Sequence, residues 1–383
     1  MIREINIFPA FNSRGEKTVK VVLKNENHEA WSIAPSGASK STFEPLYLPV
    51  DRILEKKREI ENLFTGKNEK DVDKIIVKYA GKRFEKIGGN LAIAFSQASW
   101  KLIWKDCKEV FTKKPLFPIP LSNVLGGGAH GGFTSIQEFL VFPKNPKNIL
   151  EAVEKNVQAR KLLKQKLKKK FEIYGRNDEG ALVAKISDYE ALELLAEVVE
   201  ELDMFAGLDM AATQFYSRGK YEFTGKKYSR EEFVDVVVSI AKTYKLRYIE
   251  DPFHEKDFAS FSELTKKLKR ALICGDDIYS TNATRLKKGI RKKAGNSIII
   301  KPNQVGTVSL ALKTVELAKE NGFVPVASHR SGETEDPFIA ELCIFAQIPM
   351  LKCSVSGSER FAKWNKLIEL WQLAEKPRMS KLK

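Results

Sequence analysis

Cysteine and histidine are scarce in this chain of 383 residues, which contains four of each. The cysteines have neither the spacing of a zinc site nor that of a CxxC redox motif. We therefore expect buried thiols in a reducing compartment rather than disulfides. The four positions are Cys107, Cys274, Cys343 and Cys353.

Long apolar runs are also lacking. No segment approaches the roughly 18 apolar residues that a membrane-spanning helix requires. The N-terminus, MIREINIFPAF, has charges at Arg3 and Glu4 in place of the apolar core of a signal peptide. Hydrophobic residues make up 43% and charged residues 30% of the chain, which is typical of globular proteins. These features predict a cytoplasmic protein with no membrane partner.

Acidic residues are few relative to basic ones, 49 against 65, and the formal net charge is +16. A basic surface can attract nucleic acid, anionic membranes or anionic metabolites. In the lysine-rich stretch KLLKQKLKKK (161–170), however, the amphipathic spacing turns the lysines toward water. Aromatic residues are not interleaved with the basic ones, as they are in single-strand binders. The pattern favours a solvated surface, and a nucleic-acid partner is not expected.

The first part of the chain has the pattern of a small mixed domain. Two strand-like runs, TVKVVL (18–23) and HEAWSIA (28–34), precede helical periodicity over 50–110. Strands followed by helices suggest a compact α+β domain. We place this domain at residues 1–115, before the connector LFPIP (116–120).

From about residue 200 the pattern becomes a regular alternation of short apolar runs and amphipathic helices. Continuous apolar runs indicate parallel strands that are buried on both faces. So many strand–helix units favour a closed (β/α)8 barrel over an open sheet, and we assign the barrel to residues 116–383 of an α/β fold. The runs are MFAGL (204–208), LRYI (246–249), ALICG (271–275), SIII (297–300), VPVA (324–327) and IPML (348–351).

A charged or titratable residue follows each of these runs, directly or after one further residue. The carboxyl ends of barrel strands meet at one mouth, where catalytic residues lie. One or two of the acidic residues could instead cap a helix, and Asp277 fits that role better than Asp276. The six residues are Asp209, Glu250, Asp276, Lys301, His329 and Lys352.

The three carboxylates on neighbouring strands, Asp209, Glu250 and Asp276, supply the hard oxygen ligands that Mg²⁺ prefers. The alternative is a set of unrelated caps or salt bridges. Zinc is not expected, because no cysteine or histidine cluster accompanies them.

Lys301 follows three isoleucines, so we expect its amine to be desolvated and close to other cations. Both effects lower a lysine pKa and favour a neutral amine that acts as a base; the alternative is a structural ion pair. Arg330 can clamp a phosphate or carboxylate bidentately, Ser331 adds a donor, and Lys352 adds positive charge.

Two glycine-rich loops in the first half have the composition of lids that close over a barrel mouth. They are SGASKS (36–41), which carries Ser39, and LGGGAHGG (125–132), which carries His130. Glu179 lies in the turn NDEGA (177–181), and Glu138 ends the IQE of SIQEF.

These residues stand in motifs that resemble those of the enolase family, in order and over nearly the whole chain. NSRGEKTV resembles the family's DSRGNPTV, APSGAS its VPSGAS, and LDMAATQFY its LDxAASEFY. NVLGGGAH, IQEF and DEG are similar to NxxNGGxH, QEF and DEGG. Further similar segments are YIEDPF, GDDIYSTN, IIIKPNQVGT, SHRSGETED and SERFAKWNKL.

The resemblance implies a hydro-lyase that interconverts 2-phosphoglycerate and phosphoenolpyruvate in glycolysis, with two Mg²⁺ per active site. It implies that Asp209, Glu250 and Asp276 hold one Mg²⁺, and that Ser39 chelates the second when the lid closes. It makes Lys301 the base that removes the C2 proton of 2-phosphoglycerate; lysine bases beside Mg²⁺ are a general pattern of the superfamily.

The resemblance also implies roles for the other groups. Glu179, assisted by Glu138, is expected to protonate the departing C3 hydroxyl, for which it must carry a proton at that step. Lys352 is expected to neutralise the carboxylate of the intermediate. Phosphate and further substrate contacts fall to Arg330, Ser331, His130, His329 and Gln137.

The chain departs from the family pattern at its lids and at a subunit edge. The segment EPLYLPVDR replaces the Glu-Leu-Arg-Asp that usually follows the first lid, and Lys40 and Ser41 replace Thr and Gly. Phe8 and Lys20 stand where the family usually has the Arg and Glu of its dimer contact. We therefore expect altered contacts in any homo-oligomer.

Two alternatives remain open at the level of the sequence. The altered lids suit an enolase-like paralogue that keeps metal, base and acid but takes a different carboxylate substrate. The net charge suits a protein that binds RNA or another polyanion.

Overall fold

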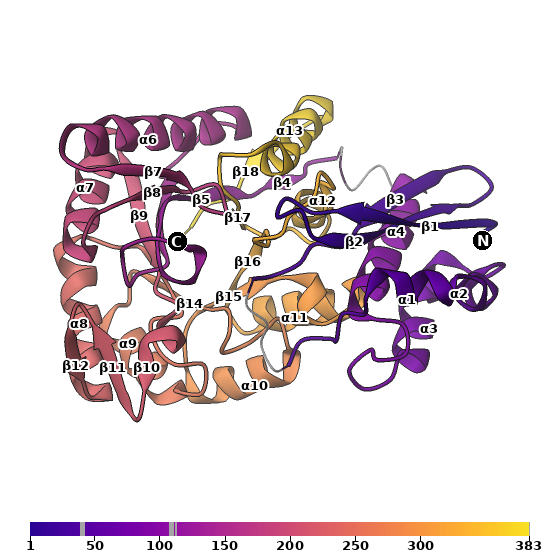
Figure 1. Ribbon diagram of the computed structural model, residues 1–383. Helices are drawn as coiled ribbons and strands as arrows, with labels where there is room; N and C mark the ends of the chain where they lie inside the picture. Colours follow the sequence, from indigo (N-terminus) through magenta and orange to yellow (C-terminus); the bar gives the residue numbers. More distant parts are fainter. Residues whose placement is uncertain (39–42, 107–110, 112, 383) are drawn as a thin grey trace.

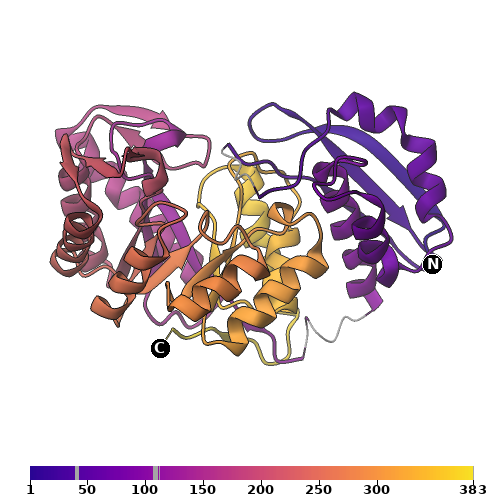
Figure 2. The same cartoon turned by 90° about the horizontal axis from the view of Figure 1, so that it is seen from below.

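The computed structural model describes residues 1–38, 43–106, 111 and 113–382. In these parts, a small N-terminal sheet with its helices lies beside a larger barrel, as two views show (Figure 1, Figure 2). Ser39 and Cys107 fall outside the described residues. Within them, no helix combines the length and the apolar character that crossing a membrane requires.

Three antiparallel strands form the N-terminal sheet, in the order β1-β2-β3. Alternate residues of the central strand, Val19, Val21 and Leu23, are fully buried in a cluster that also contains side chains of helix α4. The second and third strands confirm the two predicted runs. The sequence pattern does not predict β1, an edge strand that contains Pro9. The bounds are β1 Glu4–Phe11, β2 Lys17–Lys24, β3 Glu29–Ile33, α1 Val50–Glu55, α2 Lys57–Phe64, α3 Val72–Tyr79 and α4 Gly89–Asp106.

Eight strands close into the predicted barrel, because the last of them, β17, pairs with the first, β5. The six predicted runs form parallel strands, as expected, but β6, which is not among them, runs antiparallel to both of its neighbours. No helical crossover separates β5 from β6, and only antiparallel strands can be joined in that way. The barrel strands are β5 Ile119–Gly126, β6 Glu138–Pro143, β9 Met204–Asp209, β13 Tyr248–Glu250, β14 Leu272–Gly275, β15 Ser297–Ile300, β16 Val324–Ser328 and β17 Met350–Lys352.

Helices cover the outside of the barrel (Figure 2). Their starts follow local sequence signals: Ser187 and Ser229 each form a capping box with the glutamate three residues later. The helix over 308–320 is followed by Asn321-Gly322, with Gly322 in the left-handed region at φ 73°. The helices are α6 Ile149–Lys170, α7 Asp188–Glu201, α8 Arg230–Thr243, α9 Phe258–Lys267, α10 Ala283–Lys292, α11 Val308–Glu320, α12 Phe338–Phe345 and α13 Ser358–Leu373.

The remaining strands are short. The hairpin β7 and β8 joins the barrel through β5, β10 to β12 form a separate small sheet, and β4 pairs with β18 near the end of the chain. Their bounds are β4 Leu116–Phe117, β7 Ile173–Arg176, β8 Leu182–Ala184, β10 Tyr216–Ser217, β11 Lys220–Phe223, β12 Lys226–Tyr228 and β18 Arg378–Met379.

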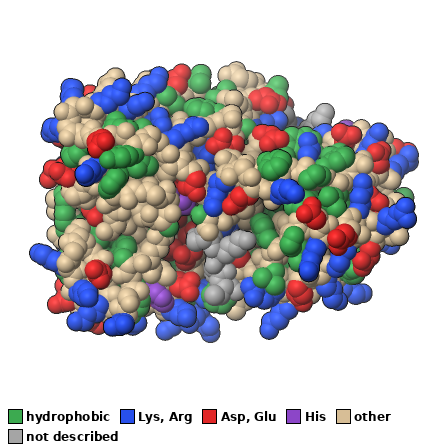
Figure 3. Space-filling model, in the orientation of Figure 1, with side chains coloured by type: hydrophobic (Ala, Val, Ile, Leu, Met, Phe, Trp, Pro, Cys, Tyr) green, Lys and Arg blue, Asp and Glu red, His purple; other side chains and the backbone are tan. Residues whose placement is uncertain are grey.

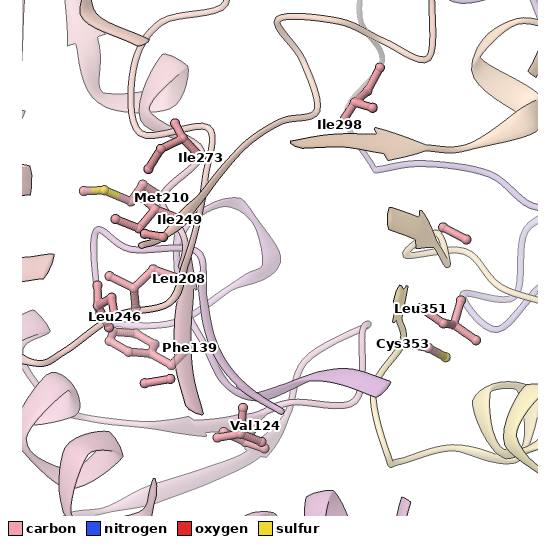
Figure 4. Packing of buried hydrophobic residues seen from close by; sticks show 14 of the residues in the cluster. Val124, Phe139, Leu208, Met210, Leu246, Ile249, Ile273, Ile298, Leu351 and Cys353 are labelled. Atoms are coloured by element: carbon pink, nitrogen blue, oxygen red, sulfur yellow. The ribbon is translucent and has the colours of Figure 1, made fainter. Parts of the chain in front are cut away.

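Side chains alternate along each barrel strand between two hydrophobic clusters. Ile249, Ile273 and Leu351 belong to the large cluster that the strands share with the helices (Figure 4). Their neighbours Tyr248, Cys274 and Met350 belong to a smaller cluster made by the other face of the strands, inside the barrel. Because side chains have a period of two in a strand, the residue two positions after an inward residue also points inward. Glu250, Asp276 and Lys352 satisfy this rule, so the barrel interior continues into a charged mouth.

The basic surface has the form that the sequence predicts. Within 161–170, Leu163 and Leu167 are fully buried while Lys161, Lys164 and Lys168 are exposed. On the face shown in Figure 3, lysine and arginine side chains are spread among acidic ones, and acidic side chains also show in a hollow near the centre.

Candidate active site

A pocket at the barrel mouth brings together the predicted site residues. Glu250 is completely buried beneath it, and Ser39 lies outside the described residues. Ala38 lines the pocket and its backbone N–H donates to Ser331 Oγ at 2.7 Å, so the first lid reaches the mouth. The predicted residues that line the pocket are His130, Gln137, Glu138, Glu179, Asp209, Asp276, Lys301, His329, Arg330, Ser331 and Lys352.

Lys352 lies at the centre of a group of buried carboxylates. Its Nζ is 2.9 Å from both Asp209 Oδ2 and Glu250 Oε2, and 3.0 Å from Glu138 Oε2. Burial opposes a charge on this amine, but the surrounding carboxylates outweigh burial and raise its pKa well above the usual value. Lys352 therefore carries a fixed positive charge, as the prediction of a charge-stabilising group requires.

Lys301, at the end of β15, two strands from β17, forms an ion pair with Asp276. Burial lowers the pKa of Lys301, but the Asp276 carboxylate outweighs it and leaves that pKa raised. The expectation of a lowered lysine pKa is therefore wrong in this structure, because the nearest group is an anion and not a cation. Gln304 Nε2 donates to the other oxygen of Asp276 at 3.1 Å and helps to fix it.

Glu138 and Glu179 form a carboxyl pair on the other side of the mouth. Burial, followed by the charges of Glu179 and Asp209, raises the pKa of Glu138 well above its usual value although Lys352 opposes this. Burial also opposes ionisation of Glu179, yet the imidazoles of His130 and His329 and the bond to Glu138 lower its pKa well below the usual value. In the absence of substrate these shifts favour the proton on Glu138 and the charge on Glu179. The expected proton on Glu179 concerns the dehydration step and stays a prediction.

Glu138 reaches the mouth because β6 is antiparallel. The first residue of this strand lies where the other strands end, and Glu138 pairs in register with Asp209 at the end of β9. His130, from the glycine-rich loop before β6, has Nε2 3.4 Å from Glu179 Oε1 and Nδ1 3.0 Å from Asp178 Oδ1. Gln137 Nε2 donates to Asp209 Oδ2 at 3.3 Å.

The donor set of the strand ends fits a hard divalent cation. Asp209, Glu250 and Asp276 offer only oxygens, and Glu250 Oε1 is buried with no hydrogen-bond partner among the described residues. Burial and the Asp209 charge raise the pKa of Glu250 to about 8, a repulsion that a cation between them would relieve. In this structure, however, Asp276 pairs with the Lys301 ammonium, whereas Asp209 and Glu250 pair with that of Lys352. Among the described residues, the potential ligand atoms that lie within 4.8 Å of one another belong to His130, Glu138 and Glu179.

The loop after β16 holds the remaining predicted groups. Arg330 Nη1 donates to Asn303 Oδ1 at 3.0 Å, and its guanidinium lies 3.4 Å from the carboxylate of Glu44. His329 is almost fully buried, with Nε2 4.0 Å from Glu179 Oε2. Arg330 can therefore bind an anion, and in this structure the anion is the carboxylate of Glu44, which follows the first lid.

Sequence reasoning did not identify several residues that shape this site. Asn303 and Gln304 lie two and three residues after Lys301, and Asp251 follows Glu250. Attention to more than one residue past the end of each strand would have included them. Asp251 accepts the backbone N–H groups of Asp276 at 3.0 Å and Asp277 at 2.7 Å and so fixes the end of β14. Arg360, on helix α13, has no comparable signal.

Comparison with known proteins agrees with this geometry. Residues 114–378, more than half of the chain, match the family model described as "Enolase, C-terminal TIM barrel domain". The chain belongs to the enolase family. It is 39% identical to the enolase of Archaeoglobus fulgidus over 99% of each chain. The enolase of Methanosphaera stadtmanae is 36% identical over 100% of this chain and 99% of its own, and that of Natronomonas pharaonis 36% over 97% and 98%.

Membership in the enolase family makes the chain a lyase and implies a divalent metal and a phosphorylated acid substrate. The enolase fold and the barrel predicted from the sequence are confirmed. The roles of single residues and the altered dimer contact stay predictions. At the position of the predicted dimer contact, Phe8 of β1 is paired with Lys20 of β2, and the Lys20 ammonium lies over the ring of Trp31.

Proposed function

We propose that this enolase-family chain catalyses the reversible, Mg²⁺-dependent dehydration of 2-phosphoglycerate to phosphoenolpyruvate. One spatial relationship supports this most: β15 and β6 are four strands apart in the closed order of eight. Lys301 and the Glu138–Glu179 pair therefore face each other across the mouth. Removal of a proton from C2 and loss of a hydroxyl from C3 need a base and an acid on opposite sides of the substrate.

Asp209, Glu250 and Asp276 are the proposed ligands of one Mg²⁺, and Ser39 is proposed for a second. When bound, Mg²⁺ supplies positive charge that stabilises the negative charge developing on the substrate carboxylate. As a metal ligand, Asp276 would share its charge and would hold Lys301 less strongly. Burial, Arg330 and Lys352 then favour the neutral amine that a base requires.

The carboxyl pair supplies the acid. Glu138 and Glu179 share a hydrogen bond and titrate as a unit. The proton that resides on Glu138 can pass along this bond to Glu179, which then delivers it to the leaving hydroxyl. Lys352 holds the carboxylate of the intermediate, Arg330 and Ser331 hold the phosphate, and His130, His329 and Gln137 complete the substrate contacts.

The organisation of the protein forms part of the same proposal. We place the boundary between the N-terminal domain (1–115) and the barrel (116–383), supported by separate apolar clusters in the two parts. A cytoplasmic location and a role in glycolysis and gluconeogenesis accompany the proposed reaction, and buried, unbridged thiols such as Cys274 suit a reducing compartment.

The decisive experiment is an assay with purified protein, 2-phosphoglycerate and saturating Mg²⁺, in which phosphoenolpyruvate is followed by its absorbance. We expect turnover by the natural chain and a loss of at least about 10²-fold in Lys301→Ala. Lys287→Ala, which removes an exposed lysine of α10, serves as the matched control. Absence of turnover in the natural chain would contradict the proposal, and turnover of a different carboxylate would favour the paralogue.

A further inference from the structure

Arg360 is one of the most buried charged residues of the protein, at 1% exposure. It lies in the first turn of α13, and its guanidinium contacts residues that line the pocket at the barrel mouth. Its Nη1 contacts the neighbouring Glu359, and its other two nitrogens point to the site. Because a buried cation costs free energy unless its hydrogen bonds are made, the partners of these nitrogens indicate what the residue does.

The first of these partners is His329. Arg360 Nε donates a hydrogen bond to His329 Nδ1 at 3.0 Å, so that this ring nitrogen must be the unprotonated one. Burial, and after it the charges of Arg360 and Lys352, lower the pKa of His329 well below its usual value although Glu179 opposes this. The neutral ring then carries its proton on Nε2, the atom that lies 4.0 Å from Glu179 Oε2.

The second set of partners are backbone carbonyls. Arg360 Nη2 donates to the carbonyl of Asp178 at 2.8 Å and to that of Ser331 at 3.2 Å. Asp178 precedes Glu179 in the turn NDEGA (177–181), called the acid loop below. Ser331 belongs to the segment SHRSGETED (328–336), called the phosphate loop below. The Ser331 carbonyl also accepts a bond from Ser13 Oγ at 3.2 Å, so the phosphate loop has a second anchor.

We infer that Arg360 is a positioning residue for the proton-donating half of the site, where it fixes the His329 tautomer and holds the backbone next to Glu179. This role rests on the proposed function. Arg360 does not touch the reacting atoms and acts through His329 and the acid loop. Lys301, on the opposite side of the mouth, does not depend on it.

Because Arg360 acts on the acid side of the site and not on Lys301, a positioning role can be distinguished experimentally from general structural support. Exchange of the C2 proton of 2-phosphoglycerate with deuterium from solvent requires only the base, whereas formation of phosphoenolpyruvate also requires the acid. In Arg360→Met we expect the dehydration kcat to fall by at least about 10²-fold. The KM and the rate of C2 exchange should stay within a factor of about 3, because Lys301 and the second phosphate-loop anchor are intact.

The matched control is Arg160→Met. Arg160 Nη2 donates to the carbonyl of Gly180 at 3.3 Å, so this variant also removes a guanidinium bond to the acid loop but leaves His329 untouched. We expect it to keep most of its dehydration rate. Arg360→Lys retains a cation that can reach some but not all of these partners, and it should fall between the natural chain and Arg360→Met. Equal losses of exchange and dehydration in the Arg360 variants, or no loss, would overturn the inference.

A second measurement does not depend on turnover. The chain has only four histidines, so ¹⁵N-histidine NMR can assign His329 by comparison with His329→Gln. We expect a neutral ring protonated on Nε2 in the natural chain and a mixture of tautomers in Arg360→Lys. A His329 ring protonated on Nδ1, or on both nitrogens, in the natural chain overturns the inference whatever the enzyme's activity. If the tautomer is as expected and turnover is absent, the proposed function alone fails.

Discussion

Lys352 Nζ lies 2.9 Å from Glu250 Oε2 in the centre of the barrel mouth, where both residues are buried. The same ammonium contacts Asp209 and Glu138, so one cation lies among carboxyl groups from three strands. A buried ion pair contributes little net stability compared with apolar residues of the same size. Removal of one partner is costly, because the other charges remain buried and unpaired.

Lys352→Met should therefore destabilise the protein by about 3–5 kcal/mol in urea unfolding. The variant should also lose activity, since its carboxylates no longer face a positive charge and the substrate carboxylate has lost its partner. Lys366→Met, which removes a half-exposed lysine of α13, is the matched control and should cost less than about 1 kcal/mol. Similar stabilities of the two variants would contradict this account of the mouth.

Mg²⁺ should raise the melting temperature of the natural chain. A ligand that binds only the folded state stabilises it by about 2.7 kcal/mol at 100 times its Kd. Glu250→Gln should abolish most of this gain, because it neutralises one of three proposed ligands. Glu263→Gln removes a more exposed carboxylate of α9 and should keep the gain. An equal Mg²⁺ effect in both variants would place the metal elsewhere, and the group formed by His130, Glu138 and Glu179 would be the first to test.

The success of the sequence analysis at the barrel mouth has a simple physical cause. Strands buried on both faces are apolar throughout, so the first charged residue marks the end of the strand. Because side chains alternate with a period of two, the position of this residue along the strand also tells whether its side chain points into the barrel. Glu250 and Asp276 are found in this way. Glu138 is different, because it begins a strand, and only the family motif identified it. Strand direction is set by the connection and not by the strand's own residues.

The charge states could not be predicted for a related reason. The sequence places Lys301 at a strand end but does not give its nearest neighbour, and a few ångströms decide whether a cation or a carboxylate lies beside it. The same holds for the proton shared by Glu138 and Glu179. Arg360 lies in a helix far along the chain, and only the fold brings it to His329.

The segment that follows the first lid takes part in a chain of hydrogen bonds that reaches Arg330. Tyr47, in the segment EPLYLPVDR, donates to the carbonyl of Pro35 at 2.8 Å and accepts from Asn303 Nδ2 at 2.9 Å. Asn303 in turn accepts from Arg330. Tyr47→Phe leaves the buried Asn303 amide without this partner, at a cost of about 1–3 kcal/mol.

We therefore expect Tyr47→Phe to raise the KM for 2-phosphoglycerate about 5-fold or more, with a smaller effect on kcat, because Arg330 is the proposed phosphate ligand. Steady-state kinetics at saturating Mg²⁺ measure both constants. The control is Tyr174→Phe, which removes an exposed hydroxyl bonded only to Glu172 among the described contacts. An unchanged KM in Tyr47→Phe would show that this chain does not position Arg330.

Glu341 on α12 gives a pH-dependent prediction away from the active site. Burial raises its pKa, and Asp336 and Glu369 add to this while Lys101 and Lys366 oppose it. Within the part of the chain that the structure describes, its Oε2 has no hydrogen-bond partner. Because the folded-state pKa lies above that of the unfolded chain, the folded state binds the proton more tightly. The stabilising contribution of Glu341 is complete below the ordinary glutamate pKa and is lost as the pH rises through the raised value.

Glu341→Gln replaces the carboxyl by a neutral group that does not titrate. The melting temperature of the variant relative to the natural chain should therefore increase from pH 4 to pH 8, in paired calorimetric scans at constant ionic strength. Glu369→Gln, which removes a more exposed carboxylate near the same site, should show a smaller trend. A difference between Glu341→Gln and the natural chain that is constant with pH would mean that Glu341 ionises in the folded state as it does in the unfolded chain.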